Sequence, residues 1–118
     1  MIVKIDNYPS MQVAIATLCR FLQEQDVSED GVFHSKLVAS ELLGNVLRHS
    51  GGYATLHGIV KNGFVELTVH SSVKFIPPAQ TTRADLYAEH GRGLFLVDAV
   101  TVERKLTESG DILVKIKM

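Results

Sequence analysis

One run of residues carries most of the information in this sequence, Lys36-Leu37-Val38-Ala39-Ser40-Glu41-Leu42-Leu43-Gly44-Asn45-Val46-Leu47-Arg48-His49. Apolar side chains recur in it every three or four residues, which is the period of an α-helix with one buried face. Glu41, Asn45 and His49 follow one another at intervals of four, so a helix turns each by only about 40° from the last and places all three on one stripe. A carboxylate, an amide and an imidazole on one stripe offer a base, a metal-binding oxygen and a phosphate-binding donor to one ligand. The run therefore predicts a helix that packs on a sheet and carries a polar stripe suited to a ligand.

The polar stripe has a simpler interpretation, which the helix alone leaves open. Any amphipathic helix has a solvent-facing side, and these polar residues can simply fill it, as in a structural or assembly domain with no ligand. The motif Gly91-Arg92-Gly93-Leu94, which opens an apolar helical pattern, favours a ligand. Glycines let phosphate oxygens approach the backbone, and the free amides of a helix N-terminus attract anions. Taken alone, this motif also fits a flexible hinge that closes a loop.

The length and composition predict a single domain spanning residues 1–118. Hydrophobic residues make up 46% of the chain, which is enough for one core. The formal net charge is −1, so there is no basic excess and nucleic acid is not an expected partner. No apolar run approaches the roughly 18 residues of a membrane span, and the N-terminal residues do not resemble a signal peptide. We therefore expect a cytoplasmic protein without membrane contact.

The predicted elements alternate between hairpins and helices. Ser28 or Asp30 is the expected cap of the helix that carries Glu41, and Asn62-Gly63 predicts a tight hairpin turn. The pattern predicts an α/β sandwich with a mixed, mainly antiparallel sheet and helices on one face. The expected ranges are strand 2–5, helix 10–25, the helix ending near residue 50, strands 53–60 and 64–70, loop 71–90, helix 94–100, and strands 101–107 and 112–117.

This combination of motifs resembles the GHKL-type ATPase fold, which is the histidine-kinase-like fold. Gyrase-like ATPases, sensor histidine kinases and the serine kinases that act as anti-sigma factors share that fold. The resemblance consists of the Glu-x3-Asn-x3-His helix, a hairpin, an irregular loop at 71–90 that matches the ATP lid, Gly91-x-Gly93-Leu94, and two closing strands. It covers nearly the whole chain, and the small size looks most like the anti-sigma-factor kinases.

The resemblance implies a role for each matching residue. Glu41 matches the general base that deprotonates the attacking hydroxyl or water. Asn45 matches the asparagine whose oxygen binds the Mg²⁺ that bridges the phosphates of ATP. His49 matches the third position on that helix, near the phosphates, where Arg48 adds positive charge. The loop that closes on the phosphates matches Gly91, Arg92, Gly93 and Leu94.

The adenine-binding segment departs from the family pattern. The family carries Asp-x-Gly after the central strand, with the aspartate accepting the adenine amine, whereas this chain carries His70-Ser71-Ser72. His70 thus stands at the cofactor-binding position, where only a neutral imidazole accepts a hydrogen bond. Gly110-Asp111 replaces the Gly-Thr that the family often has. One lost acceptor costs about 1–3 kcal/mol, or roughly 5- to 150-fold in affinity, so the departure predicts weak ATP binding, another ligand, or none.

Two functions follow from the resemblance. The first is an anti-sigma-type regulator that binds ATP and Mg²⁺ and phosphorylates a serine on an antagonist protein. Its implied partners are a sigma factor or the antagonist, and it often works as a homodimer. The alternative is a non-catalytic binding module of the same fold, which regulates a protein partner by contact and for which the altered segment His70-Ser71-Ser72 is the main support. Whether the chain is an enzyme stays open at this point.

Overall fold

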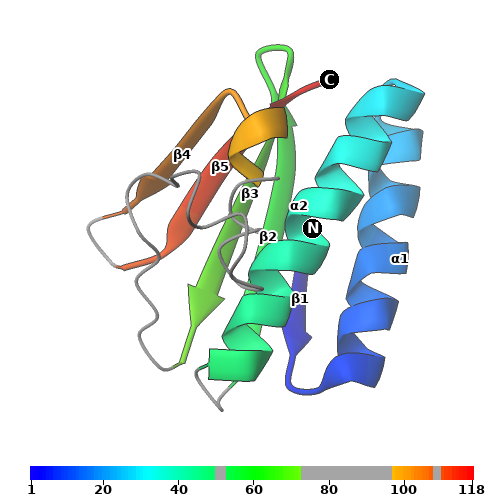
Figure 1. Cartoon of the computed structure of the whole chain (residues 1–118). Coiled ribbons are helices and arrows are strands. Elements are labelled where there is room, and N and C mark those ends of the chain that lie inside the picture. Colours follow the sequence, from blue (N-terminus) through cyan, green and yellow to red (C-terminus); the bar gives the residue numbers. More distant parts are fainter. Residues whose placement is uncertain (50–52, 73–96, 108–109) are drawn as a thin grey trace.

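The computed structural model places a five-stranded antiparallel sheet beside two long helices, which cover one of its faces (Figure 1). The structure describes residues 1–49, 53–72, 97–107 and 110–118. The elements are β1 (Ile2–Ile5), α1 (Tyr8–Glu24), α2 (Glu29–His49), β2 (Ala54–Lys61), β3 (Phe64–Ser71), helical residues 97–100, β4 (Glu103–Leu106) and β5 (Ile112–Lys117). The strand order in the sheet is β1-β2-β3-β5-β4.

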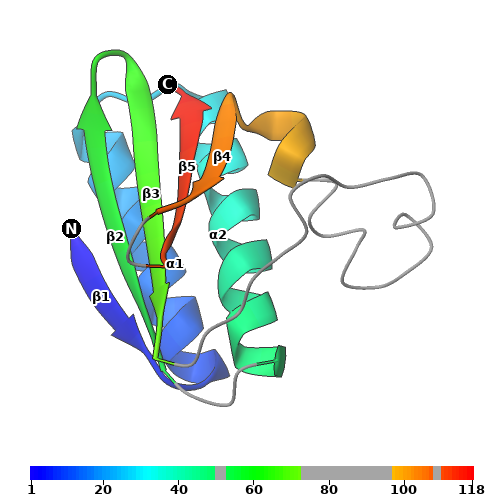
Figure 2. The same cartoon turned by 90° about the vertical axis from the view of Figure 1, so that its left-hand side faces the viewer.

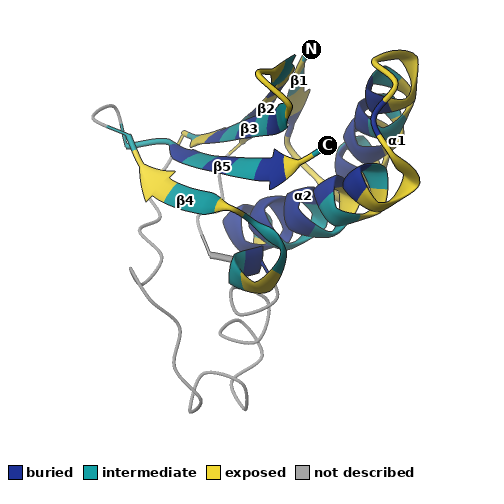
Figure 3. Cartoon of the chain, turned by 90° about the horizontal axis from the view of Figure 1, so that it is seen from above, coloured by how far each residue is buried: buried dark blue, intermediate teal, exposed yellow. Residues whose placement is uncertain are grey.

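The predicted α/β layers, the element order and the helices on one face are confirmed (Figure 3). One point differs, because every strand pair in the described part of the chain is antiparallel and the sheet is not mixed. The reason is the connection between β1 and β2. Two consecutive helices fill it, so the chain makes one extra pass and returns to the sheet in the opposite direction.

Hydrogen bonds at the helix starts fix where the helices begin. Asn7 Oδ1 accepts from the Ser10 N–H at 2.8 Å, and Ser10 Oγ accepts from the Asn7 N–H at 3.1 Å. This reciprocal capping box starts α1 at Tyr8, earlier than predicted. For α2, Ser28 Oγ accepts from the Gly31 N–H at 3.0 Å, so Ser28 is the cap.

The predicted hairpin between β2 and β3 is confirmed (Figure 2). Asn62 and Gly63 have φ values of 54° and 81°, the left-handed conformation that a two-residue turn of this type needs. The register pairs Lys61 with Phe64 and Ala54 with Ser71. This register puts alternate residues of β3 on the face toward the helices.

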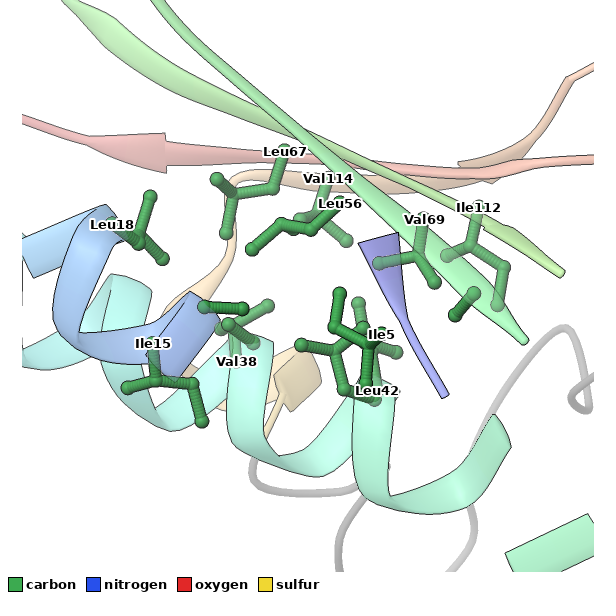
Figure 4. Close-up of a cluster of buried hydrophobic side chains, with 14 of the residues drawn as sticks. Ile5, Ile15, Leu18, Val38, Leu42, Leu56, Leu67, Val69, Ile112 and Val114 are labelled. Atoms are coloured by element: carbon green, nitrogen blue, oxygen red, sulfur yellow. The ribbon is translucent and has the colours of Figure 1, made fainter. Parts of the chain in front are cut away.

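The core fills the space between the inner face of the sheet and the two helices (Figure 4). Leu18 of α1 and Leu42 of α2 are fully buried there, as are Leu56 and Leu67 of the sheet. The apolar face predicted for α2 is confirmed, with Ala39, Leu42, Leu43 and Val46 at most 1% exposed. Because α2 is packed along most of its length, the direction of its polar stripe is fixed.

Candidate functional site

Asn45 is the most unusual residue of α2. It is fully buried, although the helical pattern placed it on the polar stripe. Its Oδ1 accepts a hydrogen bond from Nη2 of Arg48 at 2.5 Å, and arginine can only donate, so the oxygen is the atom that contacts Arg48. Its Nδ2 is buried and has no hydrogen-bond partner among the residues that the structure describes. An unpaired buried donor costs about 1–3 kcal/mol, which points to a ligand as the missing partner.

Arg48 folds back along α2 to reach this amide. A Cβ atom added at Gly44 would lie 3.8 Å from Nη1 of Arg48, so the guanidinium lies over the preceding turn of the helix. The residue as a whole is exposed, and only one of its nitrogens, Nη2, is bonded to Asn45. The C-terminal half of α2 therefore carries an accessible positive charge beside an unpaired amide donor.

Glu41 lies one helical turn before Asn45 on the same stripe and is half-buried. Within the described ranges its carboxylate makes no hydrogen bond or ion pair, so it is available as a proton acceptor. The side chain of His49 lies outside the described residues, as do Gly91, Arg92, Gly93 and Leu94 and most of the predicted lid at 71–90. Glu41, Asn45 and Arg48 are thus the predicted site residues that the structure brings together.

His70 lies on the face of the sheet that α2 does not cover. Leu67 and Val69 point to the core, so the alternation of β3 puts His70 on the outer face, where its side chain is 51% exposed. His70 Nδ1 lies 2.6 Å from Oδ1 of Asp111. Two of the positions at which the sequence departs from the family pattern, His70 and Asp111, are therefore paired with each other. At this end of β3, the residue that the alternation places on the same face as buried Leu67 and Val69 is Ser71.

The outer-face position of His70 predicts the effect of His70→Asp, which introduces the residue type that the family carries at the matching position. ATP binding is expected not to tighten, because the new carboxylate lies on the outer face. The stability is expected to fall by about 1 kcal/mol or less, since two carboxylates then face each other at an exposed site. Calorimetric ATP titration and thermal unfolding check both results, with exposed His57→Asp on β2 as the control. A tenfold gain in affinity for His70→Asp alone would contradict the assignment.

The helical residues 97–100 are anchored to β4 by an ion pair. Arg104, whose side chain is 8% exposed, donates from Nε to Asp98 Oδ1 at 2.6 Å and from Nη2 to Asp98 Oδ2 at 3.0 Å. Val97 is fully buried in the core cluster. This bidentate pair holds the segment that follows the predicted phosphate loop. The sequence did not indicate the pair, because Asp98 and Arg104 are six residues apart and a turn separates them.

The described residues do not fit Mg²⁺ at Asn45. The oxygen that would bind the ion already accepts from a guanidinium. A dication about 4 Å from that charge is repelled by roughly 2 kcal/mol in bulk water and by roughly 8 kcal/mol at an effective dielectric constant of about 20. In the described part of the chain, no group of three or more His, Cys, Asp or Glu residues could hold a metal ion. The donors on Asn45 and Arg48 fit an anion such as phosphate instead.

Comparison of the sequence with protein-family models and with curated proteins finds no match. Across the described ranges, none of the helices has both the length and the apolar character needed to cross a membrane. A functional assignment therefore rests on the geometry of α2 and on the resemblance of the motifs.

Proposed function

We propose that this protein is an ATP-binding regulator of the anti-sigma type with the GHKL fold, and that the C-terminal half of α2 binds the phosphates. The observation that carries the proposal is the buried amide of Asn45, whose unpaired N–H lies beside the guanidinium of Arg48. Together they offer a positive charge and several donors at one place, which suits phosphate oxygens. The α/β layers and the order of the elements support the same proposal.

Glu41 supports a catalytic role within this proposal. Its half-buried carboxylate lies one turn before Asn45 and has no partner among the described residues. It takes the proton from the serine hydroxyl of an antagonist protein while Asn45 and Arg48 hold the phosphates in line. Gly91 and Gly93 retain their predicted role, in which the backbone of the loop stabilises charge on the transferred group. A sigma factor or its antagonist is the proposed partner, and a homodimer the proposed assembly.

Asn45→Ala tests the phosphate site. We expect the affinity for ATP to fall by tenfold or more, because the variant removes a donor to phosphate and releases Arg48. Stability is expected to change by only about 1 kcal/mol in either direction, since the variant also removes an unsatisfied buried group. Calorimetric titration measures binding, with GTP as the ligand control and exposed Gln23→Ala on α1 as the control variant. Unchanged ATP affinity in Asn45→Ala would contradict the site.

Glu41→Gln tests the catalytic role. Water can replace the serine hydroxyl, so release of ADP reports on the same base without the protein partner. We expect the rate of ADP release to fall by a factor of at least about 100 in Glu41→Gln, while the affinity for ATP changes by less than about threefold. Glu24→Gln, an exposed glutamate of α1, is the matched control and keeps the wild-type rate.

The hydrogen bond from Arg48 to Asn45 favours a second candidate, the non-catalytic module. Arg48 occupies the oxygen that matches the Mg²⁺ ligand of the GHKL-type ATPases, and in this candidate the site binds phosphates without transferring them. In this candidate, the presence or absence of bound ATP determines whether the protein contacts its partner. Wild-type protein that binds ATP without releasing ADP, with Glu41→Gln indistinguishable from it, would favour the non-catalytic module over the kinase.

A further inference from the structure

We infer that the polyphosphate site on α2 works without a metal ion, because Arg48 supplies the positive charge at Asn45 that Mg²⁺ supplies in the GHKL-type ATPases whose motifs this chain resembles. The inference rests on the proposed function for its ligand, the phosphates of a nucleotide. It goes further by naming the form of that ligand, which is the metal-free polyphosphate. The two residues involved are joined by the hydrogen bond from Nη2 of Arg48 to Oδ1 of Asn45.

The first step of the argument concerns the oxygen of Asn45. This atom is buried, and the guanidinium approaches it to 2.5 Å. Mg²⁺ requires nearly ideal octahedral geometry and gives up its water ligands reluctantly. An oxygen that already accepts from a cation is a poor replacement for a water ligand, so the metal gains little by binding here.

The second step concerns the donors that remain for an anion. Arginine carries five N–H groups in a planar fork, and one of its nitrogens is used on Asn45. The other edge of the fork remains for phosphate oxygens. The Nδ2 of Asn45, which is buried and has no partner among the described residues, is a further donor at this place. The hydrogen bond between the two side chains holds these donors in a fixed arrangement. A phosphate group therefore finds preorganised donors and a positive charge without any ion.

Calorimetric titration with ATP tests the inference in EDTA and in excess Mg²⁺. For the wild type, we expect Mg²⁺ to raise the affinity by no more than about threefold. For Arg48→Gln, we expect the affinity in EDTA to fall by tenfold or more, and Mg²⁺ to recover part of the loss because the Asn45 oxygen is then released. Arg48→Lys keeps the positive charge but not the planar fork of donors. Its ATP affinity in EDTA should therefore fall less than that of Arg48→Gln, and Mg²⁺ should not raise it. Arg20→Gln, an exposed arginine on α1, is the matched control.

A second ligand, inorganic tripolyphosphate in EDTA, separates this inference from the proposed function. Tripolyphosphate binding that Arg48→Gln weakens supports the inference, and if ATP fails to bind in the same buffer the nucleotide function is overturned. ATP binding that Mg²⁺ strengthens by more than threefold in the wild type overturns the inference and leaves the proposed function standing. If neither ligand binds to the wild type with or without Mg²⁺, both are overturned. Thermal unfolding confirms that each variant is folded, as expected for an exposed position.

Discussion

Replacing Leu42 with alanine is expected to lower the free energy of unfolding by about 3–5 kcal/mol. Leu42 is fully buried on the inner side of α2, and it lies in the cluster with Ile5, Val69 and Ile112 (Figure 4). Those neighbours belong to three strands of one hydrogen-bonded sheet, so the core cannot easily collapse into the space that the side chain leaves. The loss therefore includes both the transfer of the side chain to water and a residual cavity. Equilibrium unfolding in urea measures it.

Leu106→Ala on β4 is the matched control for this experiment. The chemical change is the same, but Leu106 is 46% exposed and lies on an edge strand. We expect it to cost less than about 1 kcal/mol, because nearly half of the residue already contacts solvent and its site on an edge strand can relax. Similar losses for Leu42→Ala and Leu106→Ala would show that α2 does not pack on the sheet as described.

Much of this fold could be predicted because its signals are local. The period of three and four residues in α2 marked the buried positions, among them Leu42, and the structure buries them. The Asn62-Gly63 pair marked the hairpin turn, and both residues adopt the left-handed conformation that it requires. The direction of the strands was predicted less well, since it depends on how many passes the chain makes between them. The sheet is antiparallel in the described part, where a mixed sheet was expected.

The site was harder to predict because burial depends on what covers a residue. A helical wheel puts Asn45 on the polar stripe, and no local pattern shows that the residue is fully buried with Arg48 on its oxygen. The outer-face position of His70, in contrast, could be predicted from the sequence. Val65, Leu67 and Val69 alternate with period two, which places Ser71 and not His70 on the inner face.

Gly31→Ala is expected to lower the free energy of unfolding by about 1–3 kcal/mol. A Cβ atom at this position would lie 2.6 Å from Cγ1 of Val27, 2.9 Å from the backbone carbon of Met118 and 3.2 Å from the carbonyl oxygen of Lys117. Two of these three atoms are backbone, so no rotation of a side chain relieves the overlap. Helix α2 or the backbone of residues 117–118 must shift, and packing at this end of the core is lost.

Gly44→Ala, in the same helix, is expected to have the opposite sign. Apart from the backbone of the helix, the only atom of the described residues within 4 Å of its added Cβ is Nη1 of Arg48, at an ordinary contact distance of 3.8 Å. Alanine is better than glycine in a helix interior by up to about 1 kcal/mol, so stability should rise. Urea unfolding of both variants measures the difference. Because Arg48 keeps its place over the helix, we also expect unchanged ATP affinity in Gly44→Ala. A more stable protein with weaker binding would mean that glycine is needed at the site itself, and that Arg48 or the phosphate occupies the space of the added Cβ when the ligand binds.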